Sequence, residues 1–122
     1  VFKIGGAATL PPAPPLNKLV LDPPAFTGTV AQATHGADVY GRYCSVCHGD
    51  AAIAGALNPD LRRSGAIGSA DAFKTIVIGG ALHSGGMVSW KAALTPDDAE
   101  AVRQYVIERA NEDKALEKKG KT

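Results

Sequence analysis

The sequence predicts an all-α fold, in which three main helices form a small compact part behind an extended N-terminal segment. Three segments, near residues 35–46, 69–79 and 96–113, repeat their apolar residues at the helical period. The chain shows no alternating strand and helix pattern and no internal repeat. Six of the eight prolines precede residue 35, where they exclude helices and central strands.

The N-terminal 34 residues are predicted to divide into two parts. Residues 1–6, VFKIGG, are a short β-type run stopped by two glycines, typical of the last strand of a preceding β-rich domain. Residues 7–34 contain three proline pairs and are predicted to be a stiff, extended linker. Its apolar residues indicate contact with a protein surface, either a neighbouring domain or the chain's own core: Leu16, Leu19, Val20, Leu21 and Phe26.

The first predicted helix follows at residue 35 and runs into the two cysteines of the chain. Its apolar residues form one face and an adjoining strip: Val39, Tyr40, Tyr43, Cys44 and Val46. Gly36 and Gly41 each weaken the helix by about 1 kcal/mol relative to alanine. We expect Gly36 to mark a close contact with another helix, and His35 to precede the helix as an exposed residue.

The second and third predicted helices have recognisable starts. Ser69 is a plausible N-cap for a short helix that continues with the apolar residues Phe73, Ile76 and Val77 and ends near Gly79. The third helix has Thr95 at its cap and Pro96 at its first position, and its inner face is Val102, Tyr105, Val106 and Arg109. The glycine-rich loop of residues 49–68 is predicted to be irregular and to wrap around another group, and a second loop separates the other two helices. Residues 35–113 therefore form the predicted domain, and the charged residues 114–122 are expected to fray.

Composition excludes two classes of partner. The 122 residues are 45% hydrophobic with a formal net charge of +1, which fits one modest soluble domain with extensions. The basic residues form no stripe interleaved with aromatic ones, so no nucleic-acid partner is expected. No stretch reaches the roughly 20 apolar residues that a membrane span requires. The chain as given also shows no initiator methionine and no export signal, so we infer its compartment from its chemistry.

The chemistry is concentrated in the stretch Cys44-Ser-Val-Cys47-His48, which contains both cysteines. A thioredoxin-type pair needs this motif at the start of a helix after a strand, and here it ends a predicted helix. A zinc site needs four ligands, and a disulfide across so short a loop constrains little of the unfolded chain. The fourth reading, C-x-x-C-H, attaches a c-type haem through two thioethers and presents His48 to the iron. The adjacent histidine and the small core favour this reading.

Met87 is the only methionine, in a glycine-flanked loop 39 residues after His48, and Trp90 follows it. A lone methionine often only fills a gap in a core. Beside a haem, however, a thioether ligand saturates the iron and raises its reduction potential, as in electron carriers. His83 is the rival ligand, and Trp90 is a candidate haem contact or simple packing.

From residue 35 to about 112 the chain resembles a class I c-type cytochrome domain, an all-helical fold with His/Met ligation. Gly36, Tyr40 and Cys44 resemble its first helix, and Val102 and Tyr105 its last. The stretch Asn58-Pro-Asp-Leu-Arg62 resembles the family loop whose proline carbonyl, here of Pro59, accepts a hydrogen bond from the ligand imidazole. The resemblance further implies that Arg62, and also Arg63, face a haem propionate; the alternative is an ordinary solvated arginine pair.

More narrowly, YCSVCHGDAAIAG, PDLRRSGAIGSADAFKTIVIGGAL and LTPDDAEAVRQYVIERANEDK resemble the C-terminal haem domain of quinohaemoprotein alcohol dehydrogenases. The residues before the linker are similar to the end of that family's propeller domain, which holds pyrroloquinoline quinone (PQQ). Val88 departs from the family, where many members have proline after the methionine. The resemblance implies a periplasmic chain with one covalent haem c held by Cys44 and Cys47, with His48 and Met87 on the iron and no catalytic residue.

The function implied is single-electron transfer from reduced PQQ in a neighbouring dehydrogenase domain to an external acceptor, such as a quinone, a copper protein or another cytochrome. One alternative is a free-standing, diffusible periplasmic cytochrome. Another is a catalytic or sensing haem protein with an open distal site. A thiol oxidoreductase or a zinc module would instead be colourless.

Overall fold

The computed structural model describes residues 4–7, 9, 11–13, 20–54 and 58–120, and over these residues it contains helices and no strand. The α-helices are α1 Val30–Tyr43, α2 Ser45–His48, α3 Ala70–Val77 and α4 Pro96–Gly120. Short 3-10 helices lie between them: η1 Asp50–Ala52, η2 Leu61–Arg63, η3 Gly65–Gly68 and η4 His83–Gly85. The predicted all-α class is confirmed. No helix in the described part of the chain combines the length and apolarity needed to cross a membrane.

Helix α1 begins at Val30, within the segment predicted to be linker. The hydroxyl of Thr29 accepts a hydrogen bond from the backbone N–H of Gln32 at 3.1 Å, which caps the helix. The predicted linker extended too far, because its prolines mark only part of the segment. The last of them is Pro24, before the cap at Thr29. His35 therefore lies inside α1 and not before it, although its side chain is exposed as predicted and contacts Asp98 at 2.7 Å.

The first helix does not continue to Val46 as predicted. The helix ends at Tyr43, and the chain turns at Cys44 into the short helix α2. Because of this turn, Val46 does not continue the face of Val39, and its side chain is 90% exposed. Tyr40 and Cys44, the adjoining strip, are both buried as expected.

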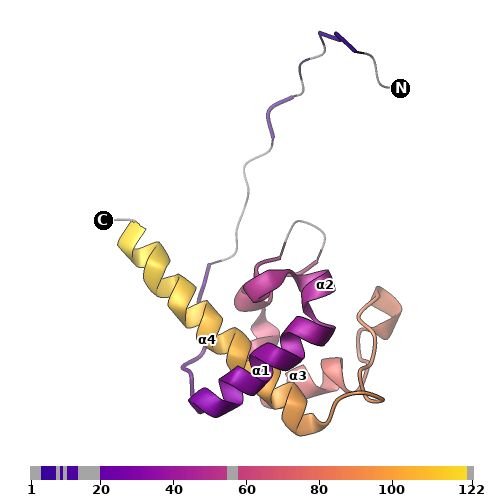
Figure 1. Ribbon diagram of the computed structural model, residues 1–122, viewed down its shortest axis with the longest axis vertical. Coiled ribbons are helices and arrows are strands. Elements are labelled where there is room, and N and C mark those ends of the chain that lie inside the picture. The colour runs from indigo at the N-terminus through magenta and orange to yellow at the C-terminus, as the bar shows by residue number, and fades with distance from the viewer. Residues whose placement is uncertain (1–3, 8, 10, 14–19, 55–57, 121–122) are drawn as a thin grey trace.

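Helices α1 and α4 cross, as the two ribbons in Figure 1 show. Gly36 lies where they meet, against Ala101 of α4. A Cβ atom at Gly36 would lie 2.0 Å from the backbone oxygen of Ala101, so only glycine allows this approach. The rings of Tyr40 and Tyr105 pack beside the crossing, with centroids 5.3 Å apart. The close contact predicted at Gly36 is confirmed.

The core lies between α1, α3 and α4. Ser69 caps α3 by accepting from Ala72, as predicted, and α3 buries Phe73 and Val77. At the start of α4, Thr95 and Asp98 exchange backbone-to-side-chain hydrogen bonds of 2.9 and 3.1 Å, so the predicted cap is present. Fully buried side chains complete the core: Tyr40, Ile67, Val102, Val106 and Ile107.

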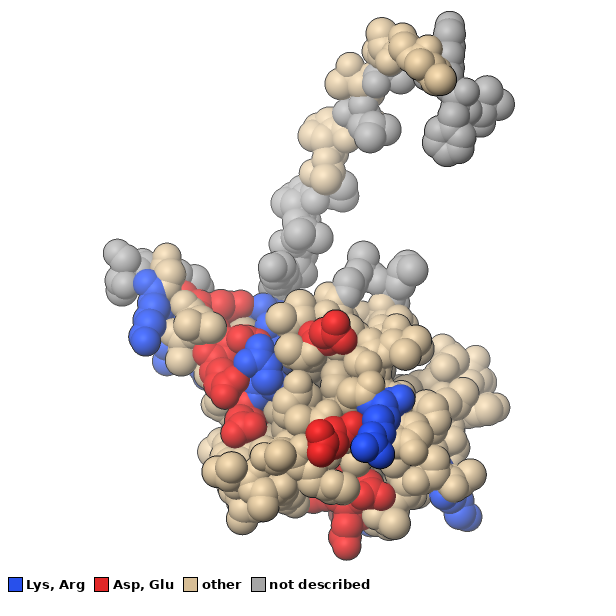
Figure 2. Space-filling view, in the orientation of Figure 1, with Lys and Arg blue, Asp and Glu red and all other residues tan. Residues whose placement is uncertain are grey.

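Helix α4 continues to Gly120, beyond the end predicted at residue 113, so the residues expected to fray are helical as far as they are described. Long-range ion pairs hold this part of the helix, with Arg63 to Glu117 at 2.7 Å and Lys114 to Asp22 at 2.9 Å. Figure 2 shows acidic and basic side chains lying close together over the same end of the helix. Sequence periodicity gave no sign of these partners, because they are distant along the chain.

Part of the predicted linker packs on the domain. Leu21 is 2% exposed, and Phe26 packs against the core, whereas Val20 is 81% exposed. The carbonyl of Pro24 accepts a hydrogen bond from Asn111 on α4 at 2.9 Å. Leu21 and Phe26 therefore cover the chain's own core. Residues 1–3, Leu16 and Leu19 lie outside the described residues, and the division of the first 29 residues into strand remnant and linker stays a prediction.

Candidate haem-attachment site

The C-x-x-C-H stretch folds as one tight turn after α1. The backbone N–H groups of Cys47 and His48 both donate to the carbonyl of Cys44, at 3.2 and 2.9 Å. Residues three apart on such a turn lie on the same face, which brings the two side chains to one side. Both thiols are free, and Cys44 is buried while Cys47 is exposed.

The environment of Cys44 does not suit a thiol oxidoreductase. Burial, and to a lesser extent the neighbouring Cys47, raises the pKa of Cys44 to about 11. A redox thiol needs the opposite shift, because the thiolate is the reactive form. A zinc module would need four ligands, and the described residues include no group of three or more His, Cys, Asp or Glu side chains placed to hold a metal ion.

His48 is 8% exposed and has a fixed ring orientation. Its Nδ1 lies 3.1 Å from the carbonyl oxygen of Pro59, which can only accept, so Nδ1 carries the proton and donates it. The contact implied by the resemblance is therefore present. Among the described residues Nε2 has no hydrogen-bond partner, and this tautomer leaves its lone pair available to a metal.

Three further residues shape this turn, in roles that no motif in the sequence indicated. The amide of Asn58 donates to the carbonyl of Cys47 at 2.7 Å. The Tyr40 hydroxyl donates to the carbonyl of Gly49 at 2.6 Å. Gly49 has φ of 81°, and a Cβ there would lie 2.0 Å from the backbone oxygen of Ile53, so glycine is required directly after the histidine.

The loop that contains Met87 is attached to both α3 and α1. The N–H of Trp90 donates to the carbonyl of Val77 at 2.8 Å, and its ring meets the ring of Tyr43 edge-on at 5.3 Å, next to Cys44. Met87 is partly buried against the core, whereas His83 is exposed. The structure thus brings the methionine loop to the end of α1 through Trp90.

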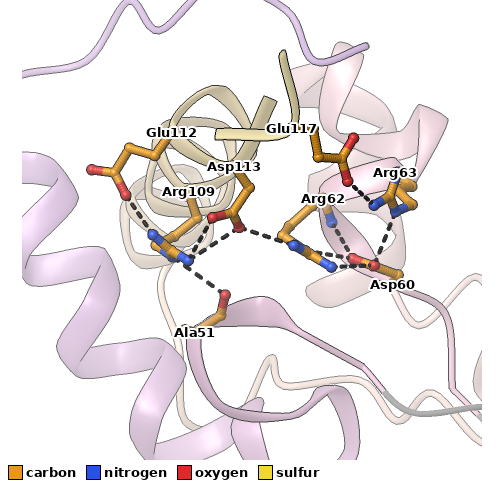
Figure 3. A network of polar contacts seen from close by, with 8 residues as sticks. All are labelled: Ala51, Asp60, Arg62, Arg63, Arg109, Glu112, Asp113 and Glu117. Atoms are coloured by element: carbon orange, nitrogen blue, oxygen red, sulfur yellow. Dashed lines mark hydrogen bonds and ion pairs between the residues drawn. The ribbon is translucent and has the colours of Figure 1, made fainter. Parts of the chain in front are cut away.

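Arg62 is placed differently from the propionate contact that the resemblance implied. Its Nε and Nη2 donate to Asp60 at 3.0 and 2.6 Å, and its Nη1 donates to Asp113 at 2.9 Å (Figure 3). All three side-chain nitrogens of Arg62 therefore donate hydrogen bonds to carboxylates. The side chains of Arg62 and Arg63 are 11% and 8% exposed, so they are not a solvated pair either. We assign Arg62 to this network of carboxylates.

The residues present fit a c-type haem. Two free thiols and an imidazole of fixed tautomer share one turn, and the only thioether of the chain lies on a loop tied to the same helix end. Exposed apolar side chains adjoin these groups along the chain, with Val46 between the two cysteines and Val88 after Met87, at 90% and 43% exposure. An apolar group with a metal centre matches this donor set and these surfaces.

Comparison with known proteins supports this fit at the level of the domain. The model of the family described as cytochrome c oxidase, cbb3-type, subunit III matches residues 31–106. The match contains the C-x-x-C-H turn, Pro59 and Met87, together with the crossing of α1 and α4 at Gly36.

Similar proteins are longer than this chain. It is 41% identical over 114 residues to quinohemoprotein alcohol dehydrogenase ADH IIB of Pseudomonas putida, a match that covers 93% of the chain and 16% of that protein. It is 41% identical over 112 residues to the dehydrogenase subunit of alcohol dehydrogenase (quinone) of Acetobacter aceti, covering 91% and 15%. The solved structure of quinohemoprotein alcohol dehydrogenase ADHIIG from Pseudomonas putida HK5 matches with a TM-score of 0.69 and 36% identity, over 88% of this chain and 15% of that one.

Proposed function

We propose that this chain, which belongs to the family described as cytochrome c oxidase, cbb3-type, subunit III, transfers single electrons with one covalently attached haem c. A c-type cytochrome domain implies haem c, and such domains carry electrons. The observation that supports the site most directly is the turn in which two free thiols accompany a histidine whose Nδ1 is bonded to Pro59 at 3.1 Å.

Different residues of the chain have different roles in binding the haem. Cys44 and Cys47 would bind it covalently, and His48 and Met87 would ligate its iron. Trp90 supports the methionine loop by packing on Tyr43. When bound, the haem supplies a reversible one-electron couple, and a His/Met ligand pair favours a high potential.

The relatives supply the proposed electron donor. Quinohemoprotein alcohol dehydrogenases match this chain over 15–16% of their length in the comparisons above. We therefore propose that a neighbouring dehydrogenase domain holds PQQ, and that the chain takes electrons from its reduced form and delivers them to an external acceptor. A quinone, a copper protein and another cytochrome are the candidate acceptors. Covalent haem attachment takes place outside the bacterial cytoplasm, so the periplasm is the proposed location.

Voltammetry of the haem-loaded chain tests this function. We expect one reversible one-electron wave, and we expect carbon monoxide to leave the spectrum of the reduced protein unchanged, because Met87 fills the sixth position. Rapid binding of carbon monoxide, or a peroxide-dependent catalytic current, would contradict a pure electron carrier. Either result would favour the open distal site of a catalytic or sensing protein.

A further inference from the structure

The carbonyl of Pro59 holds the ligand imidazole, and its position depends on its two neighbours. Proline has no N–H to bond, so the loop is fixed through the flanking side chains. On one side, Asn58 donates to the carbonyl of Cys47 at 2.7 Å. On the other side, Asp60 is the link to the rest of the domain.

Asp60 accepts hydrogen bonds from both arginines that follow it. Its Oδ1 accepts from the backbone N–H and the Nε of Arg62, at 3.1 and 3.0 Å. Its Oδ2 accepts from Nη2 of Arg62 at 2.6 Å and from Nε of Arg63 at 3.3 Å. Partial burial opposes ionisation, but the hydrogen bonds and the charge of Arg62, together with the charge of Arg63, outweigh it and lower the pKa of Asp60. The carboxylate is therefore charged at neutral pH.

Asp113 on α4 connects this loop to a second one. Its Oδ2 accepts from Nη1 of Arg62 at 2.9 Å, and both its oxygens accept from Nη2 of Arg109 at 3.1 Å. The Nε of Arg109 reaches the carbonyl of Ala51, three residues after His48, at 3.4 Å. Figure 3 shows Asp113 between the two arginines. Asp113 therefore accepts hydrogen bonds from both arginines. Arg62 reaches the loop that contains Pro59, and Arg109 reaches the loop that follows His48.

The ion pair of Asp113 and Arg62 is shielded from solvent. The side chain of Asp113 is 13% exposed and that of Arg62 is 11% exposed, so their attraction is screened less than that of a surface pair. Without the negative charge, Arg62 and Arg109 would be left as two cations that have lost a shared partner. Removing one partner of a largely buried ion pair lowers stability more than removing an exposed pair does.

We propose that Asp113 is a positioning residue for the ligand imidazole: through Arg62 and Asp60 it holds the Pro59 carbonyl against Nδ1 of His48. The inference rests on the proposed function, in which His48 is an iron ligand. The hydrogen bond that Nδ1–H donates to this carbonyl increases the basicity of the imidazole and so stabilises the ferric state. Loosening this bond therefore raises the reduction potential.

The test uses Asp113→Asn in the haem-loaded chain, which keeps the shape of the side chain and removes its charge. In the ferrous protein, NMR follows exchange of the His48 Nδ1 proton with deuterium. We expect exchange to be roughly tenfold faster than in the wild type, the factor that corresponds to loss of about one ordinary hydrogen bond. We also expect the midpoint potential to shift upward.

Glu112→Gln is the matched control. It removes the same charge from the neighbouring residue, which also pairs with Arg109 but is 55% exposed and has no bond to Arg62. A long-range Coulombic effect would shift the potential of both variants alike, whereas positioning predicts a change in Asp113→Asn and none in Glu112→Gln. Equal shifts, or an unchanged exchange rate in Asp113→Asn, would overturn the proposal.

A second variant keeps the test decisive if Asp113→Asn loses its fold. Glu117→Gln removes the exposed partner of Arg63, and we expect faster exchange by a smaller factor than for Asp113→Asn, with the potential shifted the same way. No change in this variant would then count against the network. A wild-type chain without haem would instead refute the proposed function, whereas a haem-loaded wild type with insensitive variants refutes only the positioning role.

Discussion

Replacing Met87 by alanine is expected to open the distal side of the haem and to lower the midpoint potential by on the order of 0.1 V or more, within the range of about 0.8 V that axial ligands span. The thioether stabilises the ferrous state, and water or an external ligand takes its place when the side chain is removed. The absorption band from sulfur-to-iron charge transfer should disappear, and the reduced variant should bind carbon monoxide.

Val88→Ala is the control for this experiment. It shortens the adjacent apolar side chain of the same loop, which is 43% exposed, and leaves the thioether in place. We expect its spectrum to match the wild type. If Met87→Ala also kept the sulfur-to-iron band and the potential, Met87 would not be the ligand. A spectrum of two histidine ligands in the wild type would indicate His83.

Gly36→Ala is expected to destabilise the fold by about 3 kcal/mol, at the upper end of the usual cost of overpacking. Helix propensity alone favours alanine over glycine by about 1 kcal/mol. The clash outweighs that gain, because the new Cβ would lie 2.0 Å from the backbone oxygen of Ala101, and α1 and α4 would have to separate.

Gly41→Ala provides the opposite expectation in the same helix. A Cβ at Gly41 would meet nothing within 4 Å, so only the propensity gain remains, and we expect stabilisation by about 0.5–1 kcal/mol. Denaturant unfolding followed by circular dichroism measures both variants. A Gly36→Ala chain as stable as Gly41→Ala would contradict the close crossing.

The features predicted from the sequence are those that depend on local chemistry. The caps at Ser69 and Thr95 require residues only three positions apart, and their hydrogen bonds are present in the structure. The contact of His48 with Pro59 followed from a resemblance in which both residues belong to short motifs. Gly36 was predicted because a glycine within a helix otherwise only weakens it.

The features that could not be predicted depend on partners far apart in the chain. Arg62 reaches Asp113 across 51 positions, and no periodicity or motif indicates that pair. The same holds for Arg63 and Glu117, which stabilise the end of α4 that was expected to fray. Such pairing is decided by how α4 packs on the loop after His48, which is a property of the folded chain.

Extraction with acidified acetone, followed by the pyridine haemochrome spectrum, distinguishes a covalently attached haem from one that is bound only through its iron. The extraction removes haem that is bound only through its iron, whereas thioether bonds to Cys44 and Cys47 retain it. We predict that the haem stays with the polypeptide, at one per chain, and gives the haemochrome spectrum of a c-type haem. A colourless chain, or haem that passes into the acetone, would show that Cys44 and Cys47 do not hold a haem.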